Sequence, residues 1–447
     1  MALERLTRRS ILRGMTAATA ISAPFVRGAF AAGKLNVGFW DHWVPGANDV
    51  LAKLCNEWAA KEKVDLSIDF ITSQGDKLLL TIASERQAKS GHDILTMGNW
   101  QPRDKAEDLE PVDDVMKELL SQNGPVPKIV EFLGKEDGHW IGVPTCVGTQ
   151  SKPPCARIDL LKEHAGIDVQ KMYPAGGPPD KELADRWTWD TFLDAAAKCA
   201  EAGFPFGMPL GSTSDSYDWV SAVLTAHGAM LVDEKGEVTV KSDATRQVLA
   251  WFQKLVPSLP PEVFAWDDAG NNKALIAGKA SLIMNPPSAW AVAVRDAPQI
   301  GEQLWTFPSP KGPKGRFDPF IGNFWPIWKF SPNKAAAKSL LVFLSRKAAF
   351  EELVAGSKGY DITPYDQMRD FQTWSDVGPP KGTIYNYPPR GDVILSLASA
   401  PAPPKIAVQI STQATAVKMV AQCTHQGKTI DQAIDWASGE LEGFMRS

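Results

Sequence analysis

The sequence holds 16 tryptophans, and five of them stand beside short polar side chains where a predicted strand ends or a predicted helix begins. An aromatic ring can stack on the apolar C–H face of a sugar, while carboxylates and amides bind its rim of hydroxyl groups. Taken singly, each ring is better explained by core packing, but two or more of the five are expected to face a ligand. The loops therefore predict a carbohydrate or polyol pocket, with these candidate residues: Asp41, His42, Trp43, Asn99, Trp100, Asp215, Tyr217, Trp219, Trp290, Asn323 and Trp325.

The usual catalytic motifs are missing from the sequence. It contains no dinucleotide-binding GxGxxG, no P-loop, no HExxH and no GxSxG nucleophile elbow. Ser331 and Lys334 fit an S-x-x-K pattern, but Pro332 between them is better explained as the first residue of a helix. Because the sequence has many acidic residues, it remains compatible with a catalytic pair of carboxylates. An exported carbohydrate hydrolase or lyase is therefore the alternative to a binding protein.

The five cysteines and six histidines show no metal-binding spacing, so we expect neither a metal nor a cofactor. Cys146 and Cys155 flank a pair of prolines and could form a loop disulfide in an oxidising compartment. Two separate thiols are equally compatible with the sequence.

The N-terminus has the pattern of an export signal. Arg8 and Arg9 precede an uncharged apolar stretch from Gly14 to Val26, and the small residues Ala29 and Ala31 follow it. A basic segment, a short apolar segment and an A-x-A end are typical of a removable signal peptide, and the paired arginines indicate the twin-arginine route. We expect cleavage near Ala31, removal of residues 1–31 and a periplasmic location.

The charge of the mature chain excludes some partners. The whole sequence carries a net charge of −5, and removing the five arginines and one glutamate of residues 1–31 leaves 42 basic and 51 acidic residues, a net of −9. An acidic protein has no electrostatic reason to bind nucleic acid. The length of the mature chain predicts two or three lobes rather than one small core.

Strands and helices alternate along the part of the chain that holds the first candidate residues. Because ligand loops lie at the carboxyl ends of strands in α/β folds, this order explains the positions of Trp43 and Trp100. The expected strands are 34–40, 64–71 and 93–97, and the expected helices are 48–61 and 75–89.

The other candidate residues also lie at the ends of expected elements. Thr188 and Ser242 are predicted to cap helices. A polar loop at 211–219 precedes a helix to residue 226, a buried strand at 281–284 precedes Trp290, and a strand is expected at 320–328.

Several blocks, in this order and spacing, resemble extracellular solute-binding protein family 1, the maltose-binding-protein-like components of bacterial ABC sugar importers. The blocks are Arg186–Phe192, Gly228–Gly236, Lys273–Met284, Leu304–Gly312 and Ser331–Ala337. Each is weak alone, and none is a catalytic motif.

The resemblance implies a two-lobed α/β periplasmic-binding-protein fold, type II-like, in which each lobe is a mostly parallel sheet flanked by helices. The lobes would be 34–148 plus 306–362 and 149–305 plus 363–447. Ligand would bind between them and favour a closed state. The closed protein, a monomer, would deliver its ligand to the membrane permease of an ABC importer.

Carried over residue by residue, the resemblance places Trp43, Trp100 and Trp290 beside the ligand. From their positions in the loops, Asp41, Asn99, Asp215 and Asn323 are expected to bond its hydroxyls. The family often reads N-G-P-W-x-W where this chain has Asn285-Pro-Pro-Ser-Ala-Trp290. Ser288 replaces one ring, which favours a small ligand. The family commonly has a tyrosine–asparagine pair near residues 153–156, which this chain lacks.

Phosphorylated polyols are also ligands in the family. Arg390 could pair with such a charge, although a surface arginine on a loop is an equally good interpretation of this residue.

Overall fold

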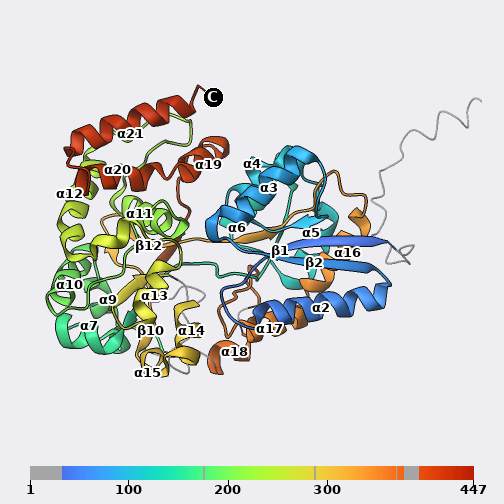
Figure 1. The fold of residues 1–447 in the computed structure, drawn as a ribbon, viewed down its shortest axis with the longest axis horizontal. Helices are drawn as coiled ribbons and strands as arrows, with labels where there is room; N and C mark the ends of the chain where they lie inside the picture. The colour runs from blue at the N-terminus through green and yellow to red at the C-terminus, as the bar shows by residue number, and fades with distance from the viewer. Residues whose placement is uncertain (1–32, 175–176, 286–287, 369, 377–391, 447) are drawn as a thin grey trace, which may run out of the picture.

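The computed structural model describes residues 33–174, 177–285, 288–368, 370–376 and 392–446. The predicted signal peptide and Arg390 lie outside these residues. Figure 1 shows two α/β lobes side by side, which confirms the expected two-lobed architecture.

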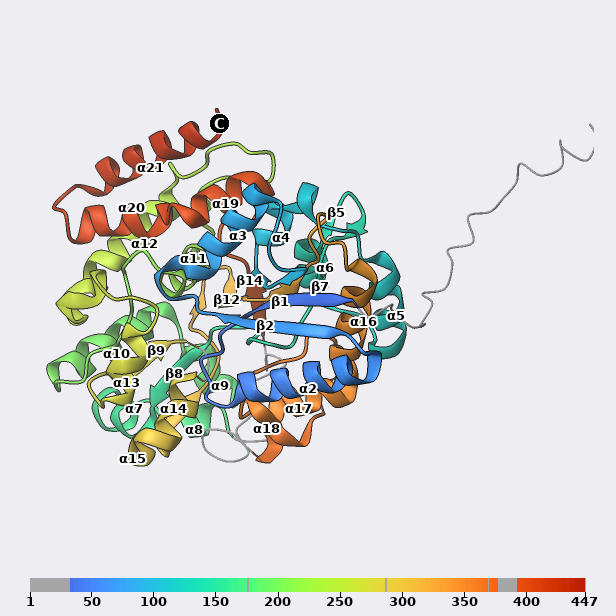
Figure 2. The same cartoon turned by 45° about the vertical axis from the view of Figure 1, so that its right-hand side comes forward.

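The first lobe is built on a parallel sheet of order β2-β1-β3, with β1 (Lys34–Trp40) between β2 (Asp65–Ile71) and β3 (Ile94–Leu95). Helices α2 (Ala47–Glu62) and α17 (Lys347–Gly356) lie on one side of β1 and β2, and α3 (Lys77–Ala88) lies on the other (Figures 1 and 2). The remaining elements of this lobe are β4 (Met97–Gly98), α4 (Gln101–Asp104), α5 (Asp113–Asn123), α6 (Lys128–Gly134), β5 (Lys135–Glu136), β6 (His139–Trp140), β7 (Val143–Pro144), β13 (Asn323–Trp325), α16 (Lys334–Leu344) and α18 (Gln372–Asp376).

The second lobe contains two small sheets. In the first, β8 (Pro154–Arg157) lies between β9 (Leu282–Met284) and β10 (Leu304–Thr306), and both pairs are antiparallel. A parallel sheet, as expected, is thus found in the first lobe, although β13 pairs there with β4 and β7 in antiparallel fashion. The prediction of a mostly parallel sheet is wrong for the second lobe. In the second sheet, β12 (Gly315–Pro319) pairs with β11 (Lys311–Gly312) and, in parallel, with β14 (Val393–Ser396).

Helices enclose these sheets, and their starts follow the predicted caps. Thr188 accepts a hydrogen bond from the backbone N–H of Thr191, and Ser242 does the same for Thr245, which confirms both caps. The helices are α7 (Ile158–Ala165), α8 (Val169–Met172), α9 (Lys181–Arg186), α10 (Trp189–Glu201), α11 (Ser214–His227), α12 (Asp243–Leu255), α13 (Gly270–Ile276), α14 (Ser288–Asp296), α15 (Pro298–Gly301), α19 (Pro404–Thr412), α20 (Thr415–Thr424) and α21 (Ile430–Phe444).

The chain passes between the lobes in segments that lie against one another. Ser151, between β7 and β8, forms an antiparallel bridge with Phe320, between β12 and β13. The Lys152 N–H donates to the Pro319 carbonyl at 2.9 Å, and the Phe320 N–H donates to the Ser396 carbonyl at 2.7 Å. The junction therefore joins segments far apart in sequence.

Two stretches lie in a different lobe from the one predicted. Strands β11 and β12 belong with the second lobe, because β12 pairs with β14 and packs against α11. Tyr365 and Trp374 are buried in the core of the first lobe with α17. The predicted boundaries at 306 and 362 each differ from this packing by about a dozen residues.

None of the helices in the described part of the chain has the length and apolar character needed to cross a bilayer.

A histidine held between two carboxylates on the first lobe makes the stability of the protein depend on pH. His92 Nδ1 lies 2.5 Å from Glu85 Oε1, and its Nε2 lies 3.0 Å from Asp69 Oδ2. Burial opposes the charge on His92, but the two carboxylates outweigh it and raise its pKa. Because the pKa is raised in the folded state, this stabilisation is complete below the unfolded value of about 6.5 and is lost as pH rises through the folded value.

We expect His92→Gln to destabilise the protein more at about pH 5.5 than at about pH 8.5. Urea unfolding of both proteins at the two pH values measures the difference. An equal loss at both would show that the imidazole charge adds nothing.

Candidate functional site

A buried ion pair marks the junction on the side of the second lobe. Lys152, on the first crossing segment, places Nζ 2.7 Å from Asp215 Oδ1 and 2.7 Å from Asp218 Oδ2. Both aspartates lie in the first turns of α11, which Thr213 caps through the N–H of Ser216. The pair therefore fixes the crossing segment to the start of this helix.

Amide side chains complete the surroundings of Asp215. Asn271 Nδ2 and Asn285 Nδ2 donate to Asp215 Oδ2 at 2.9 and 3.1 Å. Asn285 Nδ2 also lies 2.8 Å from Asn272 Oδ1, and Asn272 Nδ2 donates to the Ser288 hydroxyl at 3.0 Å. This network joins α11, α13 and the segment after β9.

The first lobe contributes the polar pair His42 and Asp361, and the ring of His42 lies between two further aromatic rings. His42 Nε2 lies 2.8 Å from Asp361 Oδ1, which also accepts the Gly148 N–H at 2.7 Å. The His42 ring lies 4.9 Å from Trp40 and 5.0 Å from Tyr360, measured between ring centroids. The His42 and Asp361 side chains are buried, so this pair is shielded from bulk water.

The charges at the junction perturb one another. Burial raises the pKa of Asp215 to about 6, although Lys152 acts in the opposite direction. Burial also raises the pKa of Asp218. Burial opposes the charge on Lys152, but Asp215 and Asp218 outweigh it and raise its pKa. Burial raises the pKa of Tyr360, and the nearby charges of Asp361 and Asp215 raise it further, while Lys152 acts in the opposite direction.

Three of the predicted tryptophans fill cores instead. Trp219 is buried and donates its indole N–H to the Pro209 carbonyl at 2.7 Å. Trp100 is buried and donates its indole N–H to the Ala398 carbonyl at 2.9 Å, in the same apolar cluster as Leu397 of the second lobe. Trp325 packs on Phe39 at 5.2 Å.

Trp290 and Trp43 lie closer to the junction. Trp290, on α14 of the second lobe, belongs to the same buried apolar cluster as Trp40 and Tyr360 of the first lobe. Trp43 is half-buried and packs against that cluster. Tyr217 lies in the core of the second lobe.

Two predicted asparagines support the crossing segments. Asn99 Oδ1 accepts the Gly322 N–H at 2.9 Å, and Asn323 Nδ2 donates to the Val147 carbonyl at 3.0 Å. A Cβ at Gly148, whose φ is +111°, would lie 2.7 Å from Asn323 Nδ2, so this turn requires glycine. Asp41 accepts a hydrogen bond from Asn48 at 2.7 Å.

Cys146 and Cys155 are free, buried thiols, so the possible disulfide is not present. Burial raises the pKa of Cys155 to about 12, and that of Cys146 is also raised. Both are inert at neutral pH. The described residues contain no group of three or more His, Cys, Asp or Glu side chains arranged to hold a metal ion.

Several residues of the junction were not predicted from the sequence, namely Lys152, Asp218, Asn271, Tyr360 and Asp361. Nothing in a single sequence marks a lysine as buried. The Asp215-x-x-Asp218 spacing was the available signal, because residues three apart share one face of a helix.

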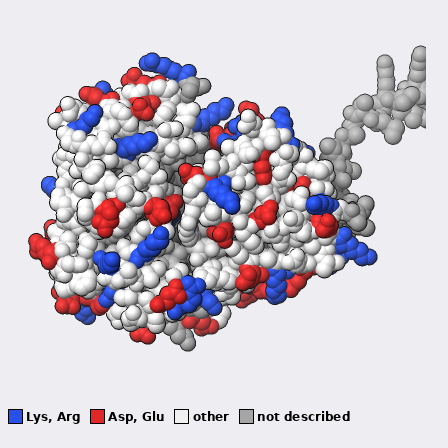
Figure 3. Space-filling model, viewed as in Figure 1, with Lys and Arg blue, Asp and Glu red and all other residues white. Residues whose placement is uncertain are grey.

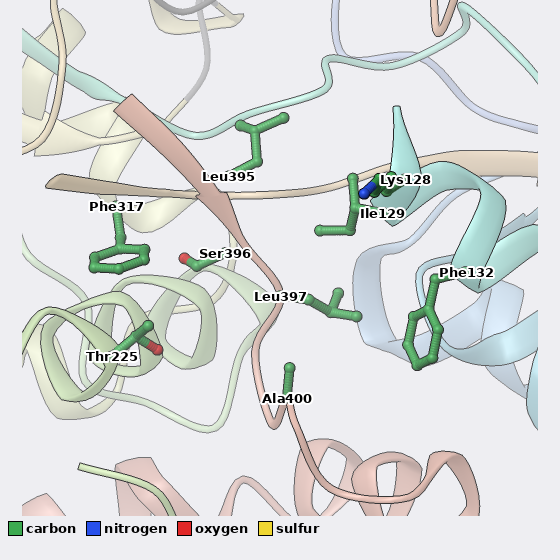
Figure 4. Close-up of a pocket in the computed structure, with 9 residues that line it drawn as sticks. All are labelled: Lys128, Ile129, Phe132, Thr225, Phe317, Leu395, Ser396, Leu397 and Ala400. Carbon is green, nitrogen blue, oxygen red and sulfur yellow. The ribbon is translucent and has the colours of Figure 1, made fainter. Parts of the chain in front are cut away.

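An apolar hollow of about 380 Å³ also spans the lobes (Figure 4). Ile129 and Phe132 of α6 face it from the first lobe, and Phe317 and Leu395 line it from the second. It contains none of the predicted ligand residues. On the face shown in Figure 3, basic and acidic side chains are interspersed over both lobes.

Solved structures share this fold. Maltose-bound MalE3 of T. maritima has a TM-score of 0.74 and 18% identity, covering 92% of this chain and 99% of that one. A sugar transporter of Arthrobacter chlorophenolicus with bound laminaribiose has a TM-score of 0.71 and 16% identity, covering 93% and 99%. An ABC transporter solute-binding protein of Agrobacterium radiobacter in complex with ribitol has a TM-score of 0.67 and 15% identity, covering 93% and 100%.

No curated protein matches the chain. The model of one family, the bacterial extracellular solute-binding proteins, matches residues 56–377, which is most of the chain. The chain, whose two lobes agree with this match, therefore belongs to the family of bacterial extracellular solute-binding proteins.

Proposed function

We propose that this protein captures a small carbohydrate or polyol between its lobes and delivers it, chemically unchanged, to an ABC import permease. The observation that supports this most is the meeting of polar and aromatic side chains from both lobes at the crossing segments. His42 and Tyr360 come from one lobe, and Asp215 and Trp290 from the other. Rings and hydrogen-bonding groups together suit a polyhydroxylated ligand.

The position of the site suggests how capture works. Ligand that contacts both lobes stabilises their closed arrangement, and the crossing segments around Ser151 and Phe320 supply the hinge. We place two of the crossings near residues 145–153 and at 320–322. The closed pair of lobes is then the form that the permease recognises.

The proposal also includes the expected route of export and the monomeric state. The protein acts as a monomer in the periplasm, after the twin-arginine route has exported it and residues 1–31 have been removed at Ala31. Asp215 accepts hydrogen bonds from a lysine and two amides, which favours a binding role over general acid catalysis.

The test is a thermal-shift screen of residues 32–447 with maltose, laminaribiose and ribitol, followed by calorimetry on those that raise the melting temperature. Ligand recovered after prolonged incubation should be intact. Recovery of a hydrolysed or eliminated product would support the enzyme alternative instead.

Trp290→Ala should weaken binding of the best sugar at least about tenfold, because a stacked ring is lost. Trp290→Phe should keep most of the affinity. Trp436→Ala is the matched control, since Trp436 lies on α21 at the opposite end of the same lobe from α14 (Figures 1 and 2). If Trp290→Ala binds as tightly as Trp436→Ala, Trp290 is not part of the site.

A further inference from the structure

A second hollow, the α20 hollow, lies within the second lobe. It has a volume of about 570 Å³ and lies between α20 and the turn Pro261–Phe264, with the loop 210–212 as a further wall. Helix α20 runs beside α21 at the outer end of this lobe (Figures 1 and 2). In the described part of the chain, none of the residues proposed to bind ligand between the lobes lines it. The α20 hollow is therefore a separate feature, and its volume suits a small-molecule ligand.

The polar side chains along the α20 hollow have no partners of their own. Gln422 is only 6% exposed, yet its side-chain oxygen Oε1 accepts no hydrogen bond from any described residue. The side chains of Lys418, His425 and Gln426 likewise form no hydrogen bond or ion pair within the described residues. A buried acceptor without a donor costs free energy, so a hydroxyl group brought into the hollow would gain by donating to Gln422.

The charge of the α20 hollow differs from that of the rest of the protein. None of the described residues that line it is acidic, although the mature chain carries nine more acidic than basic residues. Lys418, in the first turn of α20, thus contributes a positive charge without a counter-charge, and Gln422 lies one turn further along the same helix. This arrangement favours a ligand that carries a negative group at one end and hydroxyl groups beside it.

The α20 hollow also has an aromatic wall. Phe264 is half-buried and stacks on His425, with 4.4 Å between the ring centroids and 20° between the ring planes. The loop beside it packs closely, because a Cβ at Gly211 would lie only 2.6 Å from the Trp266 carbonyl oxygen. An aromatic surface of this kind can pack on the apolar C–H face of a sugar ring.

We infer that the α20 hollow binds an acidic saccharide of about two sugar units, separately from the ligand between the lobes. The carboxylate pairs with Lys418, and a neighbouring hydroxyl donates to Gln422 Oε1. The second sugar ring packs on Phe264 and His425. Seven residues of helix separate Lys418 from His425, which is about 10 Å and longer than a single sugar ring. A neutral saccharide would leave Lys418 without a counter-charge.

The experiment is calorimetry of residues 32–447 with lactobionate, which is lactose with its reducing end oxidised to a carboxylate. Lactobionate should bind, and Lys418→Met should weaken it about three- to fivefold, the size of effect expected for an exposed ion pair. Lys405→Met is the matched control, because Lys405 is exposed at the start of α19 and does not line the hollow. Lactose should bind Lys418→Met and Lys405→Met equally well.

Lactobionate that fails to bind the parent, or that binds Lys418→Met as tightly as Lys405→Met, overturns this inference. Neither result bears on the proposed capture between the lobes, which maltose, laminaribiose and ribitol test separately.

A second variant tests the hydroxyl contact. Gln422→Leu keeps the size of the side chain and removes its oxygen, so lactobionate should bind about threefold more weakly. The melting temperature should not fall appreciably, because the oxygen that is removed has no hydrogen-bond partner among the described residues. An unchanged affinity for lactobionate in a stably folded Gln422→Leu protein would contradict the role assigned to Gln422 and with it the inferred site.

Discussion

Replacing Lys152 by methionine is expected to lower the free energy of unfolding by about 3–5 kcal/mol, because it leaves two buried carboxylates without their cation. The methylene stem is kept, so the loss reports charge rather than packing. Asp215 and Asp218 cannot reach water without moving the start of α11. Urea unfolding at neutral pH measures the loss.

The loss should be largely recovered when the charge is removed from both sides. The triple variant Lys152→Met, Asp215→Asn, Asp218→Asn should be far more stable than Lys152→Met alone, since no buried charge is left unpaired. Lys53→Met is the control, because its partner Glu352 at 2.8 Å is exposed and the change should be small. A Lys152→Met protein as stable as the parent would mean that the buried pair adds nothing.

Arg316→Met is expected to cost a similar amount, about 3–5 kcal/mol. Arg316 lies on β12, is 1% exposed and donates to the carbonyls of Ala184 and Ser309 at 2.6 and 2.5 Å. Its Nε also donates to Asp392 at 2.9 Å, just before β14. Without the guanidinium, buried carbonyls lose their donor and β12 loses its tie to the segment it pairs with.

Lysine should not rescue this position, because one ammonium cannot match the planar fork that reaches four partners, the fourth being the Trp187 carbonyl at 3.3 Å. Arg246→Met is the control, since Arg246 pairs with Asp431 at 3.0 Å on the exposed side of α12 and should matter little. Thermal and urea unfolding of Arg316→Met, Arg316→Lys and Arg246→Met give the comparison. Equal stability of Arg316→Met and Arg246→Met would contradict the role assigned to Arg316.

The sequence was most informative where local rules decide the structure. The caps at Thr188 and Ser242 and the alternation of β1, α2, β2 and α3 follow from side-chain hydrogen bonding and periodicity, which act over a few residues. The direction of the strands in the second lobe does not follow from such local rules. Strands β8, β9 and β10 are three or four residues long and buried. The sequence of such a short strand does not indicate whether it pairs in parallel or antiparallel fashion.

The site was less predictable, because burial there depends on the packing of one lobe against the other. The polar run Thr149 to Lys152 is typical of a solvated loop, yet each of its side chains is buried where the segment crosses between lobes. Conversely, Trp219 follows a polar loop and was a plausible ligand contact, but it is buried in the second lobe, as are most residues of α11. In both cases, contacts between segments far apart in the sequence decide whether the side chain is buried.

The antiparallel pairing of β13 with β4 and β7 has a consequence for the order in which the protein folds. Until Trp325 has left the ribosome, β4 and β7 lack the strand that belongs between them, and α16 and α17 are still missing from the first core. Contacts this distant in sequence form slowly. The first lobe, although its chain begins the molecule, is therefore expected to finish folding only when synthesis is nearly complete.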